Sequence, residues 1–222
     1  MVANPRNTES FRAELEKRGA DLNRMVRQRH LVFWDAEETL ARIMVGYRPE
    51  WPSFERVIGA AMRQVKPRAE LSGLRIFGDM VGILWKARQF TAAVRLKELW
   101  NRLLASSPSI SLFCGYLIDV FGEDIANRSL DAMLCAHTRL LPATGSDFET
   151  AINLAMDENP GEAAENLKLL IQANFRPSWA AMPFAEATAR WPRKNLPNHA
   201  GRILDSARQH YHSLRHDAAV AF

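Results

Sequence analysis

The sequence lacks the features that define several large classes of protein. It has only two cysteines, Cys114 and Cys135, which are too few for a disulfide scaffold or a cysteine-rich zinc site. No run approaches about 18 uncharged apolar residues, so we expect no transmembrane helix and no membrane partner. Charged side chains such as Arg6, Glu9 and Arg12 stand where a secretory signal would need an apolar run, which predicts a cytoplasmic protein.

A phosphate-binding loop is also missing. Nothing in the 222 residues matches a glycine-rich loop that ends in Gly-Lys-Ser/Thr, and no strand is followed by the three-glycine dinucleotide fingerprint. Without the backbone donors and the lysine of such a loop, ATP hydrolysis loses its main means of holding the triphosphate. We therefore expect no ATPase activity and no cofactor.

Positive charge is in small excess and unevenly placed. The net charge is +4, and the balance is +5 up to residue 144 (21 bases, 16 acids) and −1 beyond it (8 bases, 9 acids). Many of the bases fall within residues 6–29, where Glu14 and Glu16 alternate with them and Phe11 is the only aromatic. Single-stranded nucleic acid would require interleaved aromatic side chains, so the pattern favours a solvated helix face and no nucleic-acid partner.

Three short apolar runs predict buried strands. They are Leu31–Trp34, Leu74–Phe77 and Ile110–Tyr116, and the first two lead directly into helical patterns. Apolar runs without alternation are typical of strands buried on both faces, as in a parallel sheet. We therefore expect an α/β domain with a mostly parallel sheet flanked by helices.

Capping residues predict where the helices of this domain begin. Asn and Asp side chains can accept hydrogen bonds from the first free amides of a helix, and glycine readily takes the left-handed conformation that ends one. A proline after the cap, or a glutamate three residues later, strengthens the signal. The expected helices start after Asn4 (to Arg18, ending at Gly19), Asp21 (to Gln28), Asp35 (to Met44) and Thr91, with a further helix over Met80–Arg88.

The pattern of apolar residues changes after residue 144. No β-branched run follows, and the apolar pattern is helical up to about residue 216. We divide the chain into an α/β domain at 1–144 and an all-helical C-terminal subdomain at 145–222. The expected helices are Phe148–Glu158, Glu162–Ala173, Ser178–Arg190 and Ala200–Leu214.

Two aspartates come directly after predicted strands. Open α/β sheets form their ligand crevice at the carboxyl ends of strands, and Asp35 and Asp79 belong at that edge. Both also have a purely structural interpretation. Asp35 would cap the helix that follows it, and Asp79 would lie in the first turn of its helix, where the dipole favours negative charge.

A second group of candidates combines thiols and a histidine. Cys114 ends the third predicted strand, and Cys135 and His137 lie close together further along the chain. They can be interpreted as part of a sensing pocket, as an incomplete metal site or as a nucleophile with its base. The structural alternative is two buried thiols and a histidine near a helix end. His212 and His216 are spaced i, i+4, but no third ligand completes a metal motif, and we expect a solvated helix end and no bound metal.

Five blocks together resemble a known family. They are LVFWDAEETLARIM (31–44), RIFGDMVGILW (75–85), AVRLKELWN (93–101), SLFCGY (111–116) and MLCAHTRLLP (133–142). In this order and spacing they resemble the MEDS domain, the sensory domain named for methanogens, methylotrophs and the dichloromethane regulator DcmR. The resemblance covers roughly residues 1–142. It implies a divergent RecA/KaiC-like fold without a working phosphate loop, a small organic ligand, and a partner in signalling or transcription regulation.

The chain departs from the family pattern in three places. Members usually begin with one more strand and helix, so we expect Met1–Ala3 to be at most the tail of a strand and the sheet edge to be left open. Leu117 stands where a proline often occurs, and Thr138 where a serine does. The C-terminal 78 residues resemble no signalling module.

Two functional hypotheses follow. The first is a non-catalytic sensory domain that binds a small organic ligand at the C-terminal edge of the sheet and signals to a partner through its helical part. The second is a protein-interaction or dimerisation module that uses the open sheet edge. An enzyme with a cysteine nucleophile is a third interpretation, which we do not favour. The ligand contacts expected under the first hypothesis are Asp35, Asp79, Cys114, Tyr116 and His137.

Overall fold

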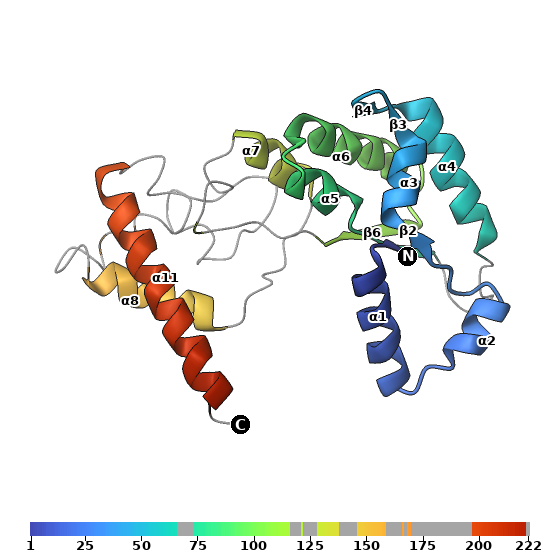
Figure 1. Ribbon diagram of the computed structural model, residues 1–222. Coiled ribbons are helices and arrows are strands. Elements are labelled where there is room, and N and C mark those ends of the chain that lie inside the picture. Colours follow the sequence, from blue (N-terminus) through green and yellow to red (C-terminus); the bar gives the residue numbers. More distant parts are fainter. Residues whose placement is uncertain are drawn as a thin grey trace. The chain divides into compact units, whose positions relative to one another are not determined.

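The chain folds into two compact units, Met1–Leu117 and Ile118–Phe222. A computed structural model describes residues 1–65, 73–115, 121, 128–137, 146–158, 166, 168–169 and 197–220 (Figure 1). The expected boundary between domains at residue 144 lies outside these residues and stays a prediction. Of the two expected helices over 162–173 and 178–190, only residues 166, 168 and 169 are described, and these are helical.

A four-stranded parallel sheet forms the centre of the first unit. The strands lie in the order β2 (Trp34–Asp35), β1 (Val2–Ala3), β5 (Leu74–Gly78) and β6 (Ile110–Cys114). β5 and β6 pair along their whole length, from Leu74↔Ile110 to Gly78↔Cys114. The expected α/β fold with a parallel sheet is confirmed.

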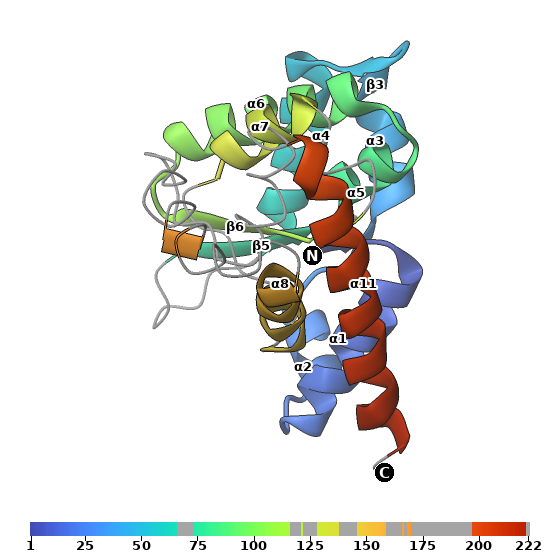
Figure 2. The same ribbon diagram turned by 90° about the vertical axis from the view of Figure 1, so that its left-hand side faces the viewer.

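Helices cover both faces of this sheet. α3 (Ala36–Ile43), α4 (Trp51–Gln64), α5 (Met80–Lys86) and α6 (Phe90–Ala105) lie on one face. α1 (Pro5–Lys17) and α2 (Leu22–Arg27) lie on the other, and Figures 1 and 2 show the two layers from directions 90° apart. A short antiparallel hairpin, β3 (Met44–Val45) and β4 (Arg48–Pro49), joins α3 to α4.

The caps form as the sequence predicts, with one exception. The Oδ1 atoms of Asn4 and Asp21 accept hydrogen bonds of 2.9 Å from the amides of Asn7 and Arg24, so α1 and α2 begin where expected. Thr91 does not cap α6. The helix begins at Phe90, and its N-cap Gln89 makes no side-chain bond.

The run at 31–34 forms less strand than its composition indicates. Only Trp34 and Asp35 are in strand conformation, and residues 31–35 are all half-buried, so the prediction of burial on both faces is wrong. The neighbouring β1 explains this, because it pairs with β2 through only two residues, Val2↔Trp34 and Ala3↔Asp35. β1 lies between β2 and β5, inside the sheet, and its two residues are buried.

The main core lies between the sheet and the α3–α6 layer. Its largest fully buried side chains include Phe54, Trp85 and Trp100, and the rings of Phe54 and Trp100 meet edge-on with centroids 5.0 Å apart. Trp85 and Trp100 are therefore core residues, whereas Trp34 is half-buried and donates its Nε1–H to Gln64 Oε1 at 3.2 Å.

Helices make up the described part of the second unit. They are α7 (Arg128–Cys135), α8 (Ser146–Glu158) and α11 (Pro197–Val220), and the last two contain the expected helices over 148–158 and 200–214. α8 packs against α11 through buried side chains such as Ile152 and Ile203. Glu158 joins the two helices at the surface, accepting hydrogen bonds from Ser206 Oγ (2.7 Å) and His210 Nε2 (2.9 Å).

Candidate functional site

The order of the strands reverses at one point along the carboxyl edge of the sheet. The chain leaves β1 into α1 on one face, and it leaves β5, the next strand in the sheet, into α5 on the opposite face. Open α/β sheets bind ligands at the point where the loops diverge in this way, so a ligand crevice is expected here. This point is flanked by Asn4, after β1, and Asp79, after β5.

The carboxylate of Asp79 lies at this point. Asp79 is 4% exposed, and its Oδ2 accepts hydrogen bonds from the Asn4 amide (2.9 Å), Asn4 Nδ2 (2.7 Å) and Asn7 Nδ2 (2.9 Å). The Asp79 amide in turn donates to Val2 O at 3.2 Å. The aspartate therefore joins the end of β5 to the beginning of α1, and this contact holds the two diverging loops together.

The second carboxylate oxygen of Asp79 has a different environment. Oδ1 is buried and has no hydrogen-bond partner among the described residues, and Asp79 makes no side-chain capping bond to α5. Buried polar atoms are nearly always paired in native proteins, so a buried carboxylate oxygen without a partner is a candidate contact for a ligand that donates a hydrogen bond. Asp79 is the N-cap residue of α5, so its position also fits the structural alternative, in which the helix dipole favours its negative charge.

A buried lysine approaches the end of the next strand. Lys97 of α6 is 3% exposed, and its Nζ donates to Cys114 Sγ at 3.4 Å. Cys114 is the last residue of β6 and pairs with Gly78, the residue before Asp79. The structure therefore brings Asp79 and Cys114 to the carboxyl ends of adjacent strands, as the sequence predicts.

Burial affects the protonation of the Cys114 thiol. Desolvation raises the pKa of Cys114 above its usual value, and the nearby Lys97 ammonium opposes this to a smaller extent. The thiol is protonated at neutral pH as a result. Since the thiolate is the nucleophilic form of cysteine, this environment disfavours the interpretation of Cys114 as a catalytic nucleophile.

Asp35 has the structural role offered as its alternative. Its Oδ1 accepts a hydrogen bond from the Glu38 amide at 2.9 Å, so it is the N-cap of α3. Because Asp35 also ends β2, it lies at the same carboxyl edge of the sheet as Asp79. A ligand contact by Asp35 stays a prediction.

The contacts expected from Tyr116 and His137 stay predictions. Tyr116 and the side chain of Cys135 lie outside the described part of the chain. His137 belongs to the second unit, where its Nδ1 lies 2.8 Å from Met133 O just after the end of α7, and its contact with a ligand stays a prediction. Within the described residues, no three His, Cys, Asp or Glu side chains are grouped so as to hold a metal ion.

Sequence reasoning missed three residues of the carboxyl edge. Asn4 was recognised only as a helix cap, and Asn7 and Lys97 were not singled out. Lys97 leaves a signal in the sequence, since with Ala93 and Trp100 it falls on the buried i, i+4, i+7 stripe of α6. The contacts of Asn4 and Asn7 with Asp79 span more than 70 residues and leave no local signal.

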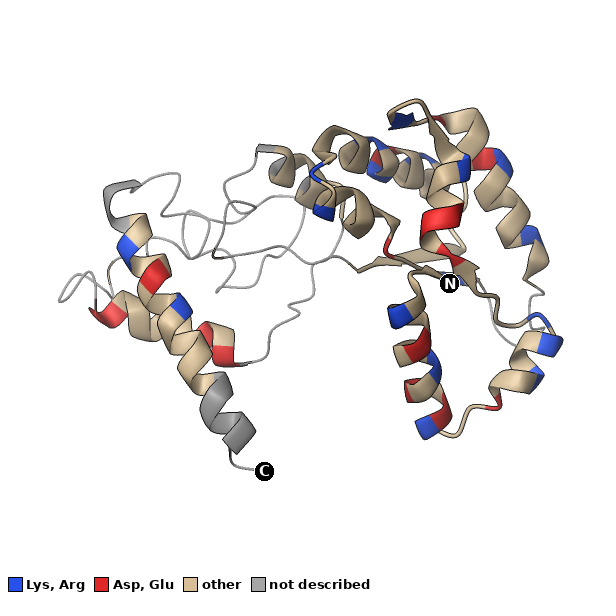
Figure 3. Cartoon of the chain, viewed as in Figure 1, with Lys and Arg blue, Asp and Glu red and all other residues tan. Residues whose placement is uncertain are grey.

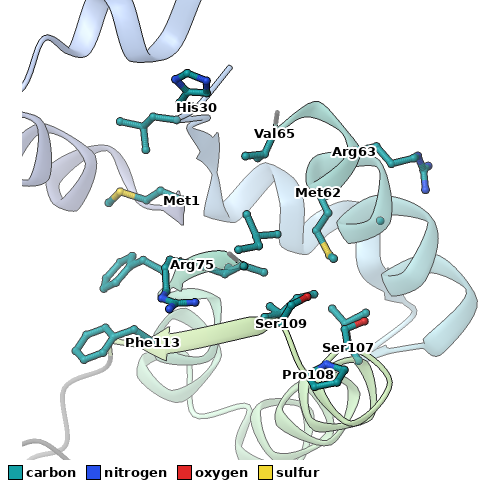
Figure 4. Close-up of a pocket in the computed structure, with 18 of the residues that line it drawn as sticks. Met1, His30, Met62, Arg63, Val65, Arg75, Ser107, Pro108, Ser109 and Phe113 are labelled. Atoms are coloured by element: carbon teal, nitrogen blue, oxygen red, sulfur yellow. The ribbon is translucent and has the colours of Figure 1, made fainter. Parts of the chain in front are cut away.

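A large pocket among the described residues lies along β5 and β6, and its lining does not include Asn4 or Asp79. Its volume is about 1350 Å³ (Figure 4). The lining is mostly apolar and includes Met62 and Phe113, with two guanidinium groups from Arg63 and Arg75. Phe113 is 51% exposed and its ring stacks on that of Phe77, with centroids 5.8 Å apart. These two strands therefore present an open, partly aromatic surface.

Charge on the first unit is mixed rather than gathered into a basic patch. Figure 3 shows acidic and basic side chains alternating along α1, where Arg18 Nε pairs with Glu14 Oε1 at 2.7 Å. This agrees with the expectation of a solvated helix face. No helix of the described part of the chain is long and apolar enough to cross a bilayer.

The first unit is an α/β domain with a parallel sheet and helices on both faces. Asp79, Asn4 and Asn7 form a polar cluster where the strand order reverses, and the sequence contains no phosphate-binding loop. The sequence model of one family, the MEthanogen/methylotroph, DcmR Sensory domain, matches residues 1–138, which is more than half of the chain. The chain belongs to this MEDS family of sensory domains, as its five sequence blocks indicate. No curated protein and no solved structure matches it.

Proposed function

We propose that this protein is a non-catalytic sensory domain that binds a small organic ligand at the carboxyl edge of its sheet. Membership of a sensory-domain family supports a signalling role. The observation that carries the location is the buried Oδ1 of Asp79, which has no hydrogen-bond partner among the described residues and lies where the strand order reverses between β1 and β5. Binding there changes the contacts of Asp79 with α1, and the helical C-terminal part passes the change to a signalling protein.

The unpaired oxygen also indicates what the ligand offers. A carboxylate oxygen only accepts hydrogen bonds, so the ligand supplies a hydroxyl or N–H donor. Asp79→Asn changes this position with little effect on packing. The amide oxygen of asparagine can still accept from Asn4 and Asn7, while its NH₂ places a donor where Oδ1 lies. The matched control is Asp21→Asn, at the N-cap of α2, because Asp21 belongs to no proposed ligand contact and an asparagine retains the capping acceptor.

Thermal shift and calorimetric titration of the full chain test the proposal, with 1-propanol and glycolamide as small hydroxyl donors. We expect at least one of these probes to stabilise the native protein and the Asp21→Asn variant and to lose its effect in Asp79→Asn. Far-UV circular dichroism checks that the variants fold. Stabilisation by neither probe, or equal stabilisation of Asp79→Asn, contradicts the proposal.

A second candidate function is protein interaction through an open edge of the sheet. The specific observation is Phe113 of β6, a strand at the edge of the described sheet. Its ring is 51% exposed, stacks on Phe77 of β5 and lines the large pocket. Exposed sheet edges with apolar side chains favour pairing with another chain. Light scattering after size exclusion tests dimerisation. Phe113→Lys abolishes a dimer under this hypothesis, whereas Tyr47→Lys, at an aromatic residue that is 94% exposed on the β3–β4 hairpin, leaves it unchanged.

A further inference from the structure

Lys97 occupies a position that ordinarily holds an apolar side chain. It lies on the buried stripe of α6 between Ala93 and Trp100, which are 0% and 2% exposed, and it is itself 3% exposed. Its aliphatic stem therefore replaces a core hydrophobe, and its ammonium reaches Cys114 at the carboxyl end of β6. This is the same edge of the sheet at which the proposed ligand binds.

The ammonium has no counter-ion among the residues that the structure describes. Its recorded hydrogen bond goes to a thiol sulfur, which is a weak acceptor, and no ion pair joins Lys97 to a carboxylate within the described residues. The next residue, Glu98, is directed elsewhere: its side chain is 56% exposed and its Oε2 lies 2.8 Å from Arg95 Nη1. A buried charge without a partner is destabilising, and a well-packed apolar residue would be tolerated better at such a position.

Resting on the proposed function, we infer that Lys97 recognises an acidic group of the ligand, so that the sensed compound is a small organic acid. A ligand carboxylate at the end of β6 supplies the counter-ion that Lys97 does not find among the described residues, and it forms a charge-assisted hydrogen bond with Nζ. Local rules of sequence are often broken at functional sites, where the cost in stability is offset by function. Lys97 is then a specificity-determining residue, distinct from the hydroxyl-accepting Asp79.

The test compares glycolate with glycolamide, which share a hydroxyl donor and differ in the acidic group. At constant ionic strength we expect the full chain to bind glycolate about tenfold more tightly or better, in line with the strength of charge-assisted hydrogen bonds. Lys97→Met keeps the aliphatic packing and removes the charge. We expect this variant to bind the two probes equally and to be at least as stable as the native protein without ligand. Lys86→Met, at an exposed lysine of α5, is the control that retains the preference.

Three results overturn the inference. Equal binding of glycolate and glycolamide by the native protein removes the acid preference while leaving the proposed function standing. An acid preference that persists in both Lys97→Met and Lys97→Gln assigns it to another residue. If neither probe binds, the proposed function is contradicted as well. Binding of the neutral glycolamide therefore distinguishes a failure of the acid preference from a failure of the proposed function.

Discussion

At the scale of single residues, Asp79 holds the centre of the first unit together. One of its oxygens accepts three hydrogen bonds from Asn4 and Asn7, which belong to a different part of the chain. Asp79→Ala leaves these donors unpaired in a buried site, and we expect it to lower the free energy of unfolding by about 2–4 kcal/mol. Urea denaturation measures this loss.

The comparison for Asp79 is the cap residue of α3. Asp35→Ala removes one exposed capping bond and should cost about 1 kcal/mol. If the two alanine variants lose the same stability, the buried network around Asp79 contributes nothing beyond an ordinary cap.

Cys114 gives a prediction that depends on pH. Because burial raises its pKa, the native protein holds the neutral thiol more strongly than the unfolded chain does. We expect slow alkylation by iodoacetamide at neutral pH, becoming faster only above the usual thiol pKa of 9.0. Mass spectrometry of the labelled protein over a pH series measures the rate, and fast labelling of Cys114 at pH 7 contradicts the assignment.

The same shift sets the sign of a stability effect. A group whose pKa is higher in the folded state contributes its full stabilisation below the pKa of the unfolded state. That contribution is lost as the pH rises through the folded value. The Cys114 contribution is therefore constant below about pH 9 and declines above it. A Cys114→Ala variant should lack this alkaline decline, and urea denaturation of both proteins between pH 7 and pH 10 measures the difference.

The sequence indicates which residues lie at the carboxyl edge but not how they are connected. Asp79 and Cys114 could be located because each stands at the end of an apolar run, and runs that form parallel strands end at one edge. The bonds of Asp79 to Asn4 and Asn7 could not be predicted, because they depend on which strand lies beside which. The role of Lys97 could have been found, since a charge on a buried helical stripe is visible in the pattern.

At the scale of elements, the entry into β5 depends on a glycine. Gly73 has φ +98, and a Cβ atom there would lie 2.4 Å from Ser109 O, the carbonyl that accepts a hydrogen bond from the Leu74 amide. Gly73→Ala adds a steric clash to the backbone strain and disturbs the pairing of β5 with β6. We expect a loss of more than about 2 kcal/mol in the free energy of unfolding.

Gly46 in the β3–β4 turn is the matched control. It also has positive φ, at +61, but a Cβ atom would meet nothing within 4 Å. Gly46→Ala should therefore cost about 1–2 kcal/mol, from conformational strain alone. Equal losses in the two variants, measured by chemical denaturation, would show that the close approach to Ser109 has no effect.

Elements with strong local signals were predictable, and those set by pairing were not. Asn4, Asp21 and Asp35 cap the helices as expected, because the side chain and the amide it accepts from are three residues apart. The run at 31–34 has the composition of a buried strand, yet only Trp34 extends into one, because the adjacent β1 offers just two residues to pair with. The length of β2 is therefore set by β1, the strand it pairs with, and not by the apolar run at 31–34.

At the scale of the whole molecule, the family match and the physical division of the chain do not coincide. The match ends at residue 138, while the first compact unit ends at Leu117. The family therefore extends into the second unit and includes α7. The composition of the sequence changes only after residue 144, which matches neither boundary, because composition does not record where packing divides.

Each unit has an apolar core of its own, and this gives a prediction for the intact chain. Phe54 in the first unit and Ile203 in the second are both 0% exposed. Phe54→Ala should cost about 3–5 kcal/mol and Ile203→Ala about 2–5 kcal/mol, each within its own core. Because chains with more than one core depart from two-state unfolding, we expect scanning calorimetry of the full chain to show that each variant lowers a different transition. A single transition that both variants lower in the same way would mean that the two cores unfold as one.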